Sequence, residues 1–408
     1  TYTLVSETGG KMSDGFFRPG RPDGMACFAH PASSDKCILM RNHENWFDVP
    51  TGSPFGKGNE LLDRVSDSQL YDRKTDGSPF FGGVTKVVYD LKNNRMESDH
   101  LVLTGTAANC AGGPTPWGSW LTCEEEMLKA PSEAQKDHGF VFETPSAADG
   151  LIDAVPLKAM GRFAHEAAAV DPETGIVYMT EDSRKALFYR FSPKVKGDLA
   201  KGGQLQALAI KGWESAVTNN WPEDWGGGGP GRIKNGQEFA VEWIDLDDVE
   251  SPNADLAERG HKAGAAYFCR GEGMDYGIRP GSNVGEIFFT CTQGGTSQTG
   301  QVWRYTPGEI GKLTMLFESP GADTLDLCDN LSLAPWGDII LCEDGRGSQY
   351  LRGLTPDGKI YDLAKNAHKD EAEFCGACWS PDGKTMFVNV QNPGFTYAIN
   401  GPWENLRT

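Results

Sequence analysis

The sequence carries one ten-residue pattern in two distant places. Residues 116–125 read PWGSWLTCEE, and residues 335–344 read PWGDIILCED. In both copies a Pro-Trp-Gly turn, an apolar segment, a cysteine and two acidic residues stand in the same register. A repeated segment of this kind predicts a fold that uses one strand-and-turn unit several times.

The rest of the chain reads as short strands separated by turns. Segments such as 177–180, 286–291, 339–342 and 385–390 are rich in β-branched and aromatic residues and are bounded by Gly, Pro, Asp or Asn. Few segments have a helical pattern, which excludes a parallel α/β sheet. We therefore predict an all-β fold, a β-propeller formed as a single domain over residues 1–408. Helical or loop insertions are expected near 126–138, 195–235 and 246–262.

Charge restricts the partners of this chain. It has 38 Lys and Arg against 57 Asp and Glu, a formal net charge of −19. Such an acidic chain lacks the basic surface that nucleic-acid binding requires, and it is unsuited to anionic membranes. No apolar run reaches the roughly 18 residues of a membrane span. We expect a soluble monomer that begins after a removed leader, because the chain starts at Thr1 without a methionine.

Several predicted strands end in acidic residues. These acids are Glu44, Glu124, Glu125, Glu166, Glu181, Asp182, Glu343 and Asp344. In a propeller, equivalent strands surround one central channel, so their ends converge. Clustered carboxylates repel unless cations compensate them, and oxygen ligands suit Ca²⁺. A cysteine in the cluster would add a ligand suited to iron or zinc. The alternative is that these acids are turn residues or lie on solvated rims.

Two further segments add candidate ligands. Arg270 and Glu272 are two residues apart and would share one face of an extended segment. A guanidinium beside a metal-binding carboxylate can hold a phosphate group in its planar fork. Asp329 and Asn330 supply oxygen ligands shortly before the second copy of the repeat.

The motifs together resemble those of the PhoX-type alkaline phosphatases. The resemblance rests on stretches that keep the family's order along nearly the whole chain, which are 41–44, 82–86, 109–125, 161–170, 177–182, 270–277, 328–345 and 373–394. It implies a six-bladed propeller that is secreted or periplasmic after twin-arginine export. It also implies hydrolysis of small phosphomonoesters at a centre of Fe³⁺ and Ca²⁺ ions.

The resemblance also assigns roles to residues. It implies that Cys123, Glu166 and Glu272 bind iron and that Arg270 holds the substrate phosphate, with Arg270, Glu272 and Cys123 as the catalytic group. The calcium ligands that it suggests are Glu44, Glu124, Asp182, Asp329, Asn330 and Glu343. A metal-bound oxide or hydroxide would then attack phosphorus, and no protein nucleophile is needed.

Two other functions remain open from the sequence. The first is a calcium-dependent propeller hydrolase of another ester, such as a lactone or a phosphotriester, which would leave Cys123 without a role. The second is a non-catalytic propeller that binds calcium for stability. Neither explains why Cys123, Arg270 and Glu272 occur together.

Overall fold

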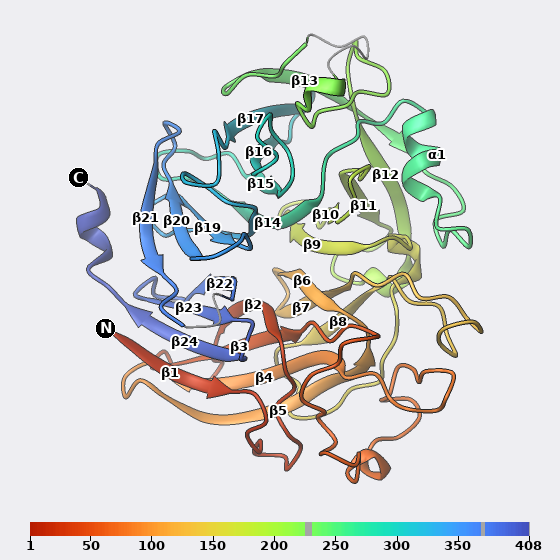
Figure 1. The fold of residues 1–408 in the computed structure, drawn as a ribbon, viewed down its shortest axis with the longest axis vertical. Coiled ribbons are helices and arrows are strands. Elements are labelled where there is room, and N and C mark those ends of the chain that lie inside the picture. Colours follow the sequence, from red (N-terminus) through yellow and green to blue (C-terminus); the bar gives the residue numbers. More distant parts are fainter. Residues whose placement is uncertain (225–230, 369–371, 408) are drawn as a thin grey trace.

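The computed structural model describes residues 1–224, 231–368 and 372–407, and the strands lie in antiparallel sheets around a common centre (Figure 1). The first three blades in chain order consist of β2 (Pro22–Ala29), β3 (Lys36–His43), β4 (Gly82–Asp90) and β5 (Arg95–Thr106); β6 (Asn109–Pro114), β7 (Ser119–Glu124) and β8 (Val141–Pro145); and β9 (His165–Val170), β10 (Val177–Glu181), β11 (Tyr189–Pro193) and β12 (Gly203–Ile210).

The remaining blades follow in the same order around the centre. They consist of β14 (Gly271–Gly277), β15 (Glu286–Cys291), β16 (Gln301–Thr306) and β17 (Lys312–Glu318); β18 (Cys328–Leu333), β19 (Ile339–Glu343), β20 (Tyr350–Leu354) and β21 (Ile360–Lys365); and β22 (Phe374–Trp379), β23 (Thr385–Val390), β24 (Phe395–Asn400) and β1 (Tyr2–Glu7). One further strand, β13 (Glu238–Asp245), pairs with both β12 and β17 and so joins the third and fourth blades into one nine-stranded sheet.

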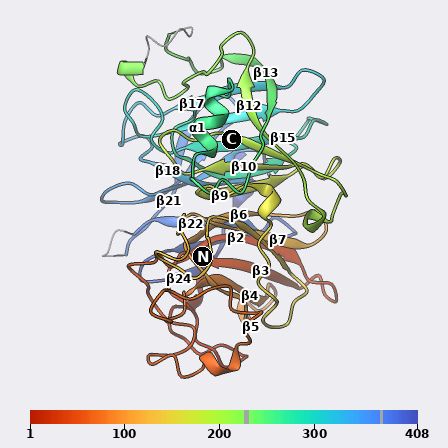
Figure 2. The same cartoon turned by 90° about the vertical axis from the view of Figure 1, so that its right-hand side faces the viewer.

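The first strand of each blade faces the centre. Contacts run from β2 to β6, β6 to β9, β9 to β14, β14 to β18, β18 to β22 and β22 back to β2. These contacts close a ring of inner strands, which confirms the predicted β-propeller. Figure 2 shows the molecule from the side, with β13 near one end and β5 near the other.

The last blade is closed by both ends of the chain. β1 pairs antiparallel with β24, with Tyr2 opposite Ile399 and Glu7 opposite Phe395. Val5 of β1 is buried and packs with residues of β2, β3, β4 and β23. A propeller that shares a blade between its two termini resists opening, because unfolding that blade requires both ends to separate.

Little helix is present in the described part of the chain. It comprises α1 (Leu256–Lys262) and the short 3₁₀ turns η1 (Leu62–Arg64), η2 (Lys158–Met160), η3 (Leu199–Lys201), η4 (Pro222–Asp224) and η5 (Trp403–Arg407). The helix α1 lies within the insertion expected near 246–262. The insertion expected over 195–235 contains η3, β12 and η4, and its residues 225–230 lie outside the described part. None of these described helices is long and apolar enough to cross a membrane.

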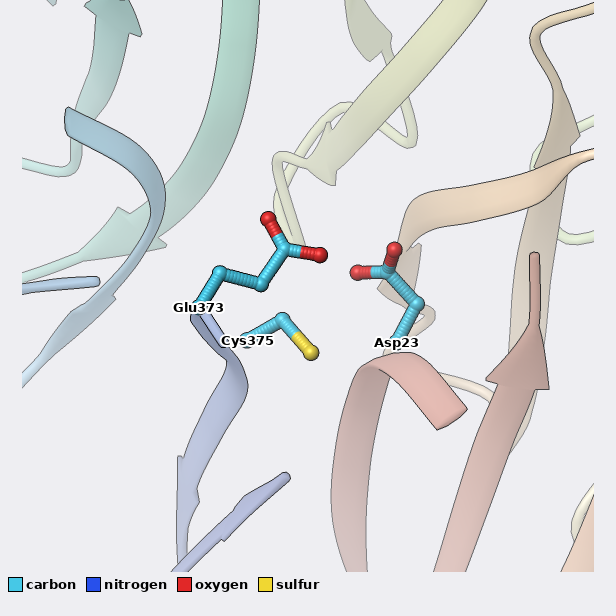
Figure 3. A group of neighbouring side chains, drawn as sticks. All are labelled: Asp23, Glu373 and Cys375. Atoms are coloured by element: carbon cyan, nitrogen blue, oxygen red, sulfur yellow. The ribbon is translucent and has the colours of Figure 1, made fainter. Parts of the chain in front are cut away.

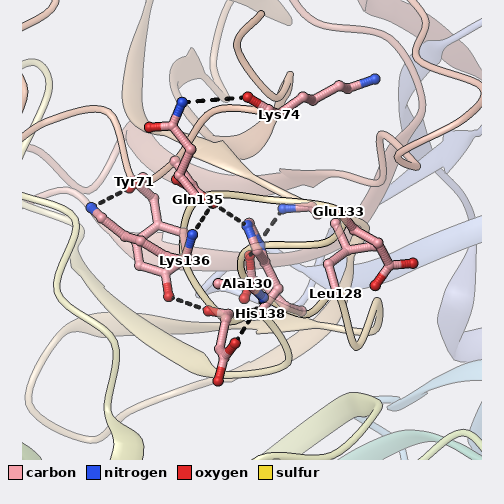
Figure 4. A network of polar contacts seen from close by, with 12 residues as sticks. Tyr71, Lys74, Leu128, Ala130, Glu133, Gln135, Lys136 and His138 are labelled. Carbon is pink, nitrogen blue, oxygen red and sulfur yellow. Dashed lines mark hydrogen bonds and ion pairs between the residues drawn. The ribbon is translucent and has the colours of Figure 1, made fainter. Parts of the chain in front are cut away.

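The segment expected as an insertion over 126–138 has no regular secondary structure beyond turns, and hydrogen bonds fix it to the first blade (Figure 4). The Gln135 side chain donates to the Lys74 carbonyl, and the Lys136 ammonium donates to the Tyr71 carbonyl. Within the segment, the His138 backbone N–H donates to the Leu128 carbonyl. These bonds hold the loop that follows β7 in a defined position beside the central channel.

Candidate metal and phosphate site

A cavity of about 240 Å³ lies at the centre of the ring. Its wall is almost entirely polar and carries nine carboxylates, two arginines and one cysteine. The lining residues are Arg21, Asp23, Glu44, Trp46, Cys110, Glu125, Glu166, Asp182, Arg270, Glu272, Asp329, Asp344, Glu373 and Gln391.

The inner strands contribute the first set of these side chains by a common rule. In five blades the second residue of the inner strand lines the cavity, namely Asp23, Cys110, Glu166, Glu272 and Asp329. The residue just before the inner strand lines it in three blades, namely Arg21, Arg270 and Glu373. Arg270 precedes β14 with a left-handed φ of 52°, and it lines the cavity beside Glu272.

The second strands contribute the other set. In five blades the residue directly after the second strand lines the cavity, and these residues are Glu44, Glu125, Asp182, Asp344 and Gln391. The repeat found in the sequence is therefore a repeat of site geometry, because its two copies end at Glu125 and Asp344.

The acids one position before three of these cavity-lining residues have a structural role. Glu124, Glu181 and Glu343 are buried at the ends of β7, β10 and β19, and each accepts hydrogen bonds from the loop that follows. Glu181 accepts from the Leu187 backbone N–H at 3.0 Å and from the Tyr189 hydroxyl at 2.8 Å. Glu343 accepts from the Tyr350 N–H and forms an ion pair with Arg352. In each pair the first acid anchors a loop and the second faces the channel.

Four residues expected as ligands do not line this cavity. Cys123 is fully buried in a hydrophobic cluster with Leu121 and Val141. Glu124 is held by His138 at 2.7 Å and by backbone N–H groups, and Glu343 is held by Arg352. Asn330 accepts from the Gly376 N–H and donates to Asp329, so it supports a lining residue without lining the cavity. For Glu124, Glu343 and Asn330 the physical reason is strand alternation, which turns neighbouring side chains to opposite sides. Cys123 instead lies within β7 and packs in the core between blades.

The other predicted residues meet at the cavity. They are Glu44, Glu166, Asp182, Arg270, Glu272 and Asp329. The sequence did not lead to Arg21, Asp23, Cys110 and Glu373, which also line the cavity. In the two acidic pairs of the repeat, Glu125 and Asp344 line the cavity, whereas the expected ligands were Glu124 and Glu343. For Cys110 a signal existed, because it lies in the same family-like stretch, 109–125, as Cys123. For Asp23 the comparison of Arg-Pro-Asp-Gly (21–24) with Arg-Gly-Glu-Gly (270–273) would have pointed to it.

The pKa shifts indicate that the negative charges of these carboxylates are not balanced by nearby positive groups. Burial raises the pKa of Glu44 to about 7, although the Arg21 guanidinium opposes the rise. Burial, together with the Asp344 carboxylate, raises the pKa of Asp329 to about 8. The pKa values of Glu166 and Glu272 also lie well above their usual range, first through burial and then through neighbouring acids. Cations bound among these groups would relieve both the burial cost and the repulsion.

The donor atoms fit metal ions. One ligand atom each from Cys110, Glu125 and Glu166 lie within 4.8 Å of one another, and the same holds for Glu166, Glu272 and Asp329. A third such group consists only of carboxylates, from Asp329, Asp344 and Glu373. All ten cysteines are in the described residues and none forms a disulfide, so the Cys110 sulfur is available as a ligand. Thiolate with carboxylates suits a transition metal, and carboxylates alone suit Ca²⁺.

Arg270 occupies the cavity wall in a fixed orientation. Its Nε and Nη2 donate to the two carboxylate oxygens of Asp182, both at 2.7 Å, and Nη2 also donates to Glu272 at 2.8 Å. Burial alone would lower the pKa of Arg270, but the Glu272 and Asp182 carboxylates raise it. Within the described residues Nη1 makes no hydrogen bond. A positive group held this rigidly among acids can receive an anion that the acids alone would repel.

Comparisons with known proteins agree with this geometry. The profile of the family described as Alkaline phosphatase PhoX matches residues 57–394. No curated protein sequence matches the chain. The structure of Pseudomonas fluorescens PhoX in complex with vanadate, a transition state analogue, has 17% sequence identity and a TM-score of 0.70, and the alignment covers 98% of this chain and 94% of that one.

A second solved structure is much less similar. XC5397, a gluconolactonase from Xanthomonas campestris, shows 9% identity over 98% of each chain with a TM-score of 0.42, which is too low to carry an argument. The PhoX structure supports the propeller fold, and the profile match covers most of the sequence. The chain therefore belongs to the PhoX alkaline phosphatase family and is a phosphoric monoester hydrolase.

Proposed function

We propose that the protein releases inorganic phosphate from small phosphomonoesters at a cluster of Fe³⁺ and Ca²⁺ ions in the central cavity. The observation that carries this proposal is the ring of nine carboxylates and one cysteine around Arg270. Bound cations supply Lewis-acid charge and lower the pKa of bound water. Membership of the PhoX family supports the same reading.

In this proposal, separate groups of residues bind iron and calcium. Cys110, Glu125 and Glu166 hold iron, because a thiolate ligand favours a transition metal over Ca²⁺. Asp329, Asp344 and Glu373 offer only oxygen ligands and hold Ca²⁺.

Arg270 receives the phosphate group, and its role is to balance negative charge on the phosphoryl oxygens. Asp182 holds the guanidinium in a bidentate contact, so Arg270 is oriented before substrate arrives. The family resemblance further supports secretion or a periplasmic location. The monomeric state and the single domain over 1–408 remain predictions.

A comparison of substrates tests the proposal. The purified chain should release phosphate from p-nitrophenyl phosphate, while a lactone and a phosphotriester should be hydrolysed far more slowly. Glu272→Gln should lower kcat/KM for the phosphomonoester by about 10²-fold or more, since it removes one charge from the cluster. Glu238→Gln, on the outer strand β13, serves as the control. Faster turnover of the lactone or the triester would refute the proposal.

A further inference from the structure

A second group with a cysteine lies on the other side of the first blade. Asp23, Glu373 and Cys375 each place one ligand atom within 4.8 Å of the other two. Figure 3 shows the carboxylates of Asp23 and Glu373 facing each other, with the Cys375 sulfur beside them. Cys375 belongs to β22, Glu373 directly precedes this strand, and Asp23 belongs to β2.

This group repeats the arrangement around Cys110. Cys110 and Cys375 are both the second residue of an inner strand, and Glu166 and Asp23 are both the second residue of the inner strand in the next blade. The hydrogen bonds of the two thiols repeat as well.

The Cys110 sulfur donates to the carbonyl of His165 at 3.2 Å, and the Cys375 sulfur donates to the carbonyl of Pro22 at 3.1 Å. His165 and Pro22 are the residues that directly precede Glu166 and Asp23. The two cysteine–carboxylate pairs are thus equivalent positions of the propeller.

An unsatisfied oxygen provides an independent indication of a ligand. Asp23 is only 3% exposed, and its Oδ1 has no hydrogen-bond partner among the described residues. Its other oxygen, Oδ2, accepts from the Gln391 amide at 3.2 Å. A buried carboxylate oxygen without a donor is costly, and a cation is a suitable partner for it.

We propose that Asp23, Glu373 and Cys375 form a second thiolate-containing metal site, which binds a transition metal ion of the iron or zinc class. The thiolate makes the site less suited to Ca²⁺, whose ligands are oxygen atoms. On binding, the Cys375 S–H bond is replaced by a sulfur–metal bond and the proton passes to solvent. The inference rests on the proposed function only in assuming that the cavity holds cations.

Cobalt reports on the two thiolates directly. The full chain, produced in medium with Co²⁺ as the added transition metal and purified without chelators, should show thiolate-to-Co²⁺ absorption in the near ultraviolet. Cys375→Ser and Cys110→Ser should each remove about half of this absorption, and the double variant should remove nearly all of it. Asp23→Asn should lose about one Co²⁺ per chain while both cysteines remain.

Cys378→Ser is the matched control, because Cys378 lies three residues further along β22 but packs in a hydrophobic cluster. An unchanged spectrum and cobalt content in Cys375→Ser would overturn the proposal, as would an equal loss in Cys378→Ser. Circular dichroism on the same samples separates loss of metal from loss of fold. Phosphatase activity is assayed separately on wild type loaded with Fe³⁺ and Ca²⁺, so an inactive iron-loaded wild type whose cobalt form shows two thiolate ligands would refute the proposed function and leave this site supported.

Discussion

At the scale of single residues, two neighbouring acids at the end of a strand have different roles. One faces the central cavity, and the other accepts hydrogen bonds from the loop that follows. Asp182 lines the cavity and holds Arg270, whereas its neighbour Glu181 accepts hydrogen bonds from Leu187 and Tyr189. Alternation of side chains along the strand produces this division of roles. It makes neighbouring acids informative controls for one another.

The two cysteines near the second blade should behave differently. Cys110→Ser should lose bound iron and lower kcat by about 10²-fold or more, because Cys110 lies among the proposed ligands. Cys123→Ala should keep iron and activity and cost about 1 kcal/mol of unfolding free energy, because Cys123 only packs in the core. Iron analysis, turnover and urea unfolding measure the three quantities. Loss of iron in Cys123→Ala alone would restore the assignment made from the sequence.

The contribution of Arg270 to activity is expected to depend on the planar geometry of its guanidinium group. Arg270→Lys keeps the charge but cannot bind Asp182 and a phosphate through parallel N–H groups. We expect kcat/KM for a phosphomonoester to fall by about 10²–10³-fold while metal content stays unchanged. Arg190→Lys, on β11 and stacked over Trp243 away from the cavity lining, is the control. Equal activity of Arg270→Lys and wild type would exclude the proposed phosphate contact.

At the scale of structural elements, the loop after β7 is fixed by a buried ion network. His138 contacts Glu124 at 2.7 Å through Nδ1 and Asp72 at 3.2 Å through Nε2. Burial alone would lower the pKa of His138, but the Glu124 and Asp72 carboxylates raise it to about 9. The protonated imidazole thus connects the first blade, the second blade and the loop that carries Glu125.

This network makes stability depend on pH with a defined sign. A raised folded-state pKa adds stability that is fully present below the ordinary histidine value of 6.5 and is lost as the pH rises through about 9. His138→Gln should therefore be less stable than wild type at pH 6, and the difference should shrink towards pH 10. Unfolding by urea across this range measures it. A difference that grows with pH would show that His138 is neutral in the folded protein.

The propeller and the general location of the site could be predicted from the sequence, but the side chains could not all be chosen. Turn residues and the repeat at 116–125 and 335–344 predict the blades, because the formation of a turn depends mainly on residues that are adjacent in the sequence. Whether Glu124 or Glu125 faces the channel depends on where β7 ends, which local patterns do not determine to one residue. Asp23 and Glu373 meet only because the ends of the chain close the ring.

At the scale of the whole molecule, the closure between β1 and β24 should be necessary for stability. Val5 is buried with residues of the first and last blades, whereas Leu4 beside it is 47% exposed. Val5→Ala should lower the unfolding free energy by about 1–2 kcal/mol, from the loss of two buried methyl groups, and Leu4→Ala should cost clearly less. Urea unfolding compares them. Equal effects would mean that β1 contributes little to holding the ring closed.

The net charge of −19 also has a structural explanation. Nine carboxylates line one cavity, and among the described residues that line it only Arg21 and Arg270 are positively charged, so part of the acid excess lies where cations would neutralise it. An anionic phosphate ester can enter such a cavity only if bound cations reverse its local field. In the proposed function, bound ions would therefore serve substrate binding as well as the chemical step.

The most direct test is phosphomonoesterase activity measured against metal content. Protein purified without chelators should hydrolyse p-nitrophenyl phosphate, and removing its metals should abolish turnover while circular dichroism confirms that the chain remains folded. Returning Fe³⁺ and Ca²⁺ together should restore activity, and Ca²⁺ alone should not, because the site at Cys110 would stay without its metal. Full activity in the folded, metal-free protein would contradict the account.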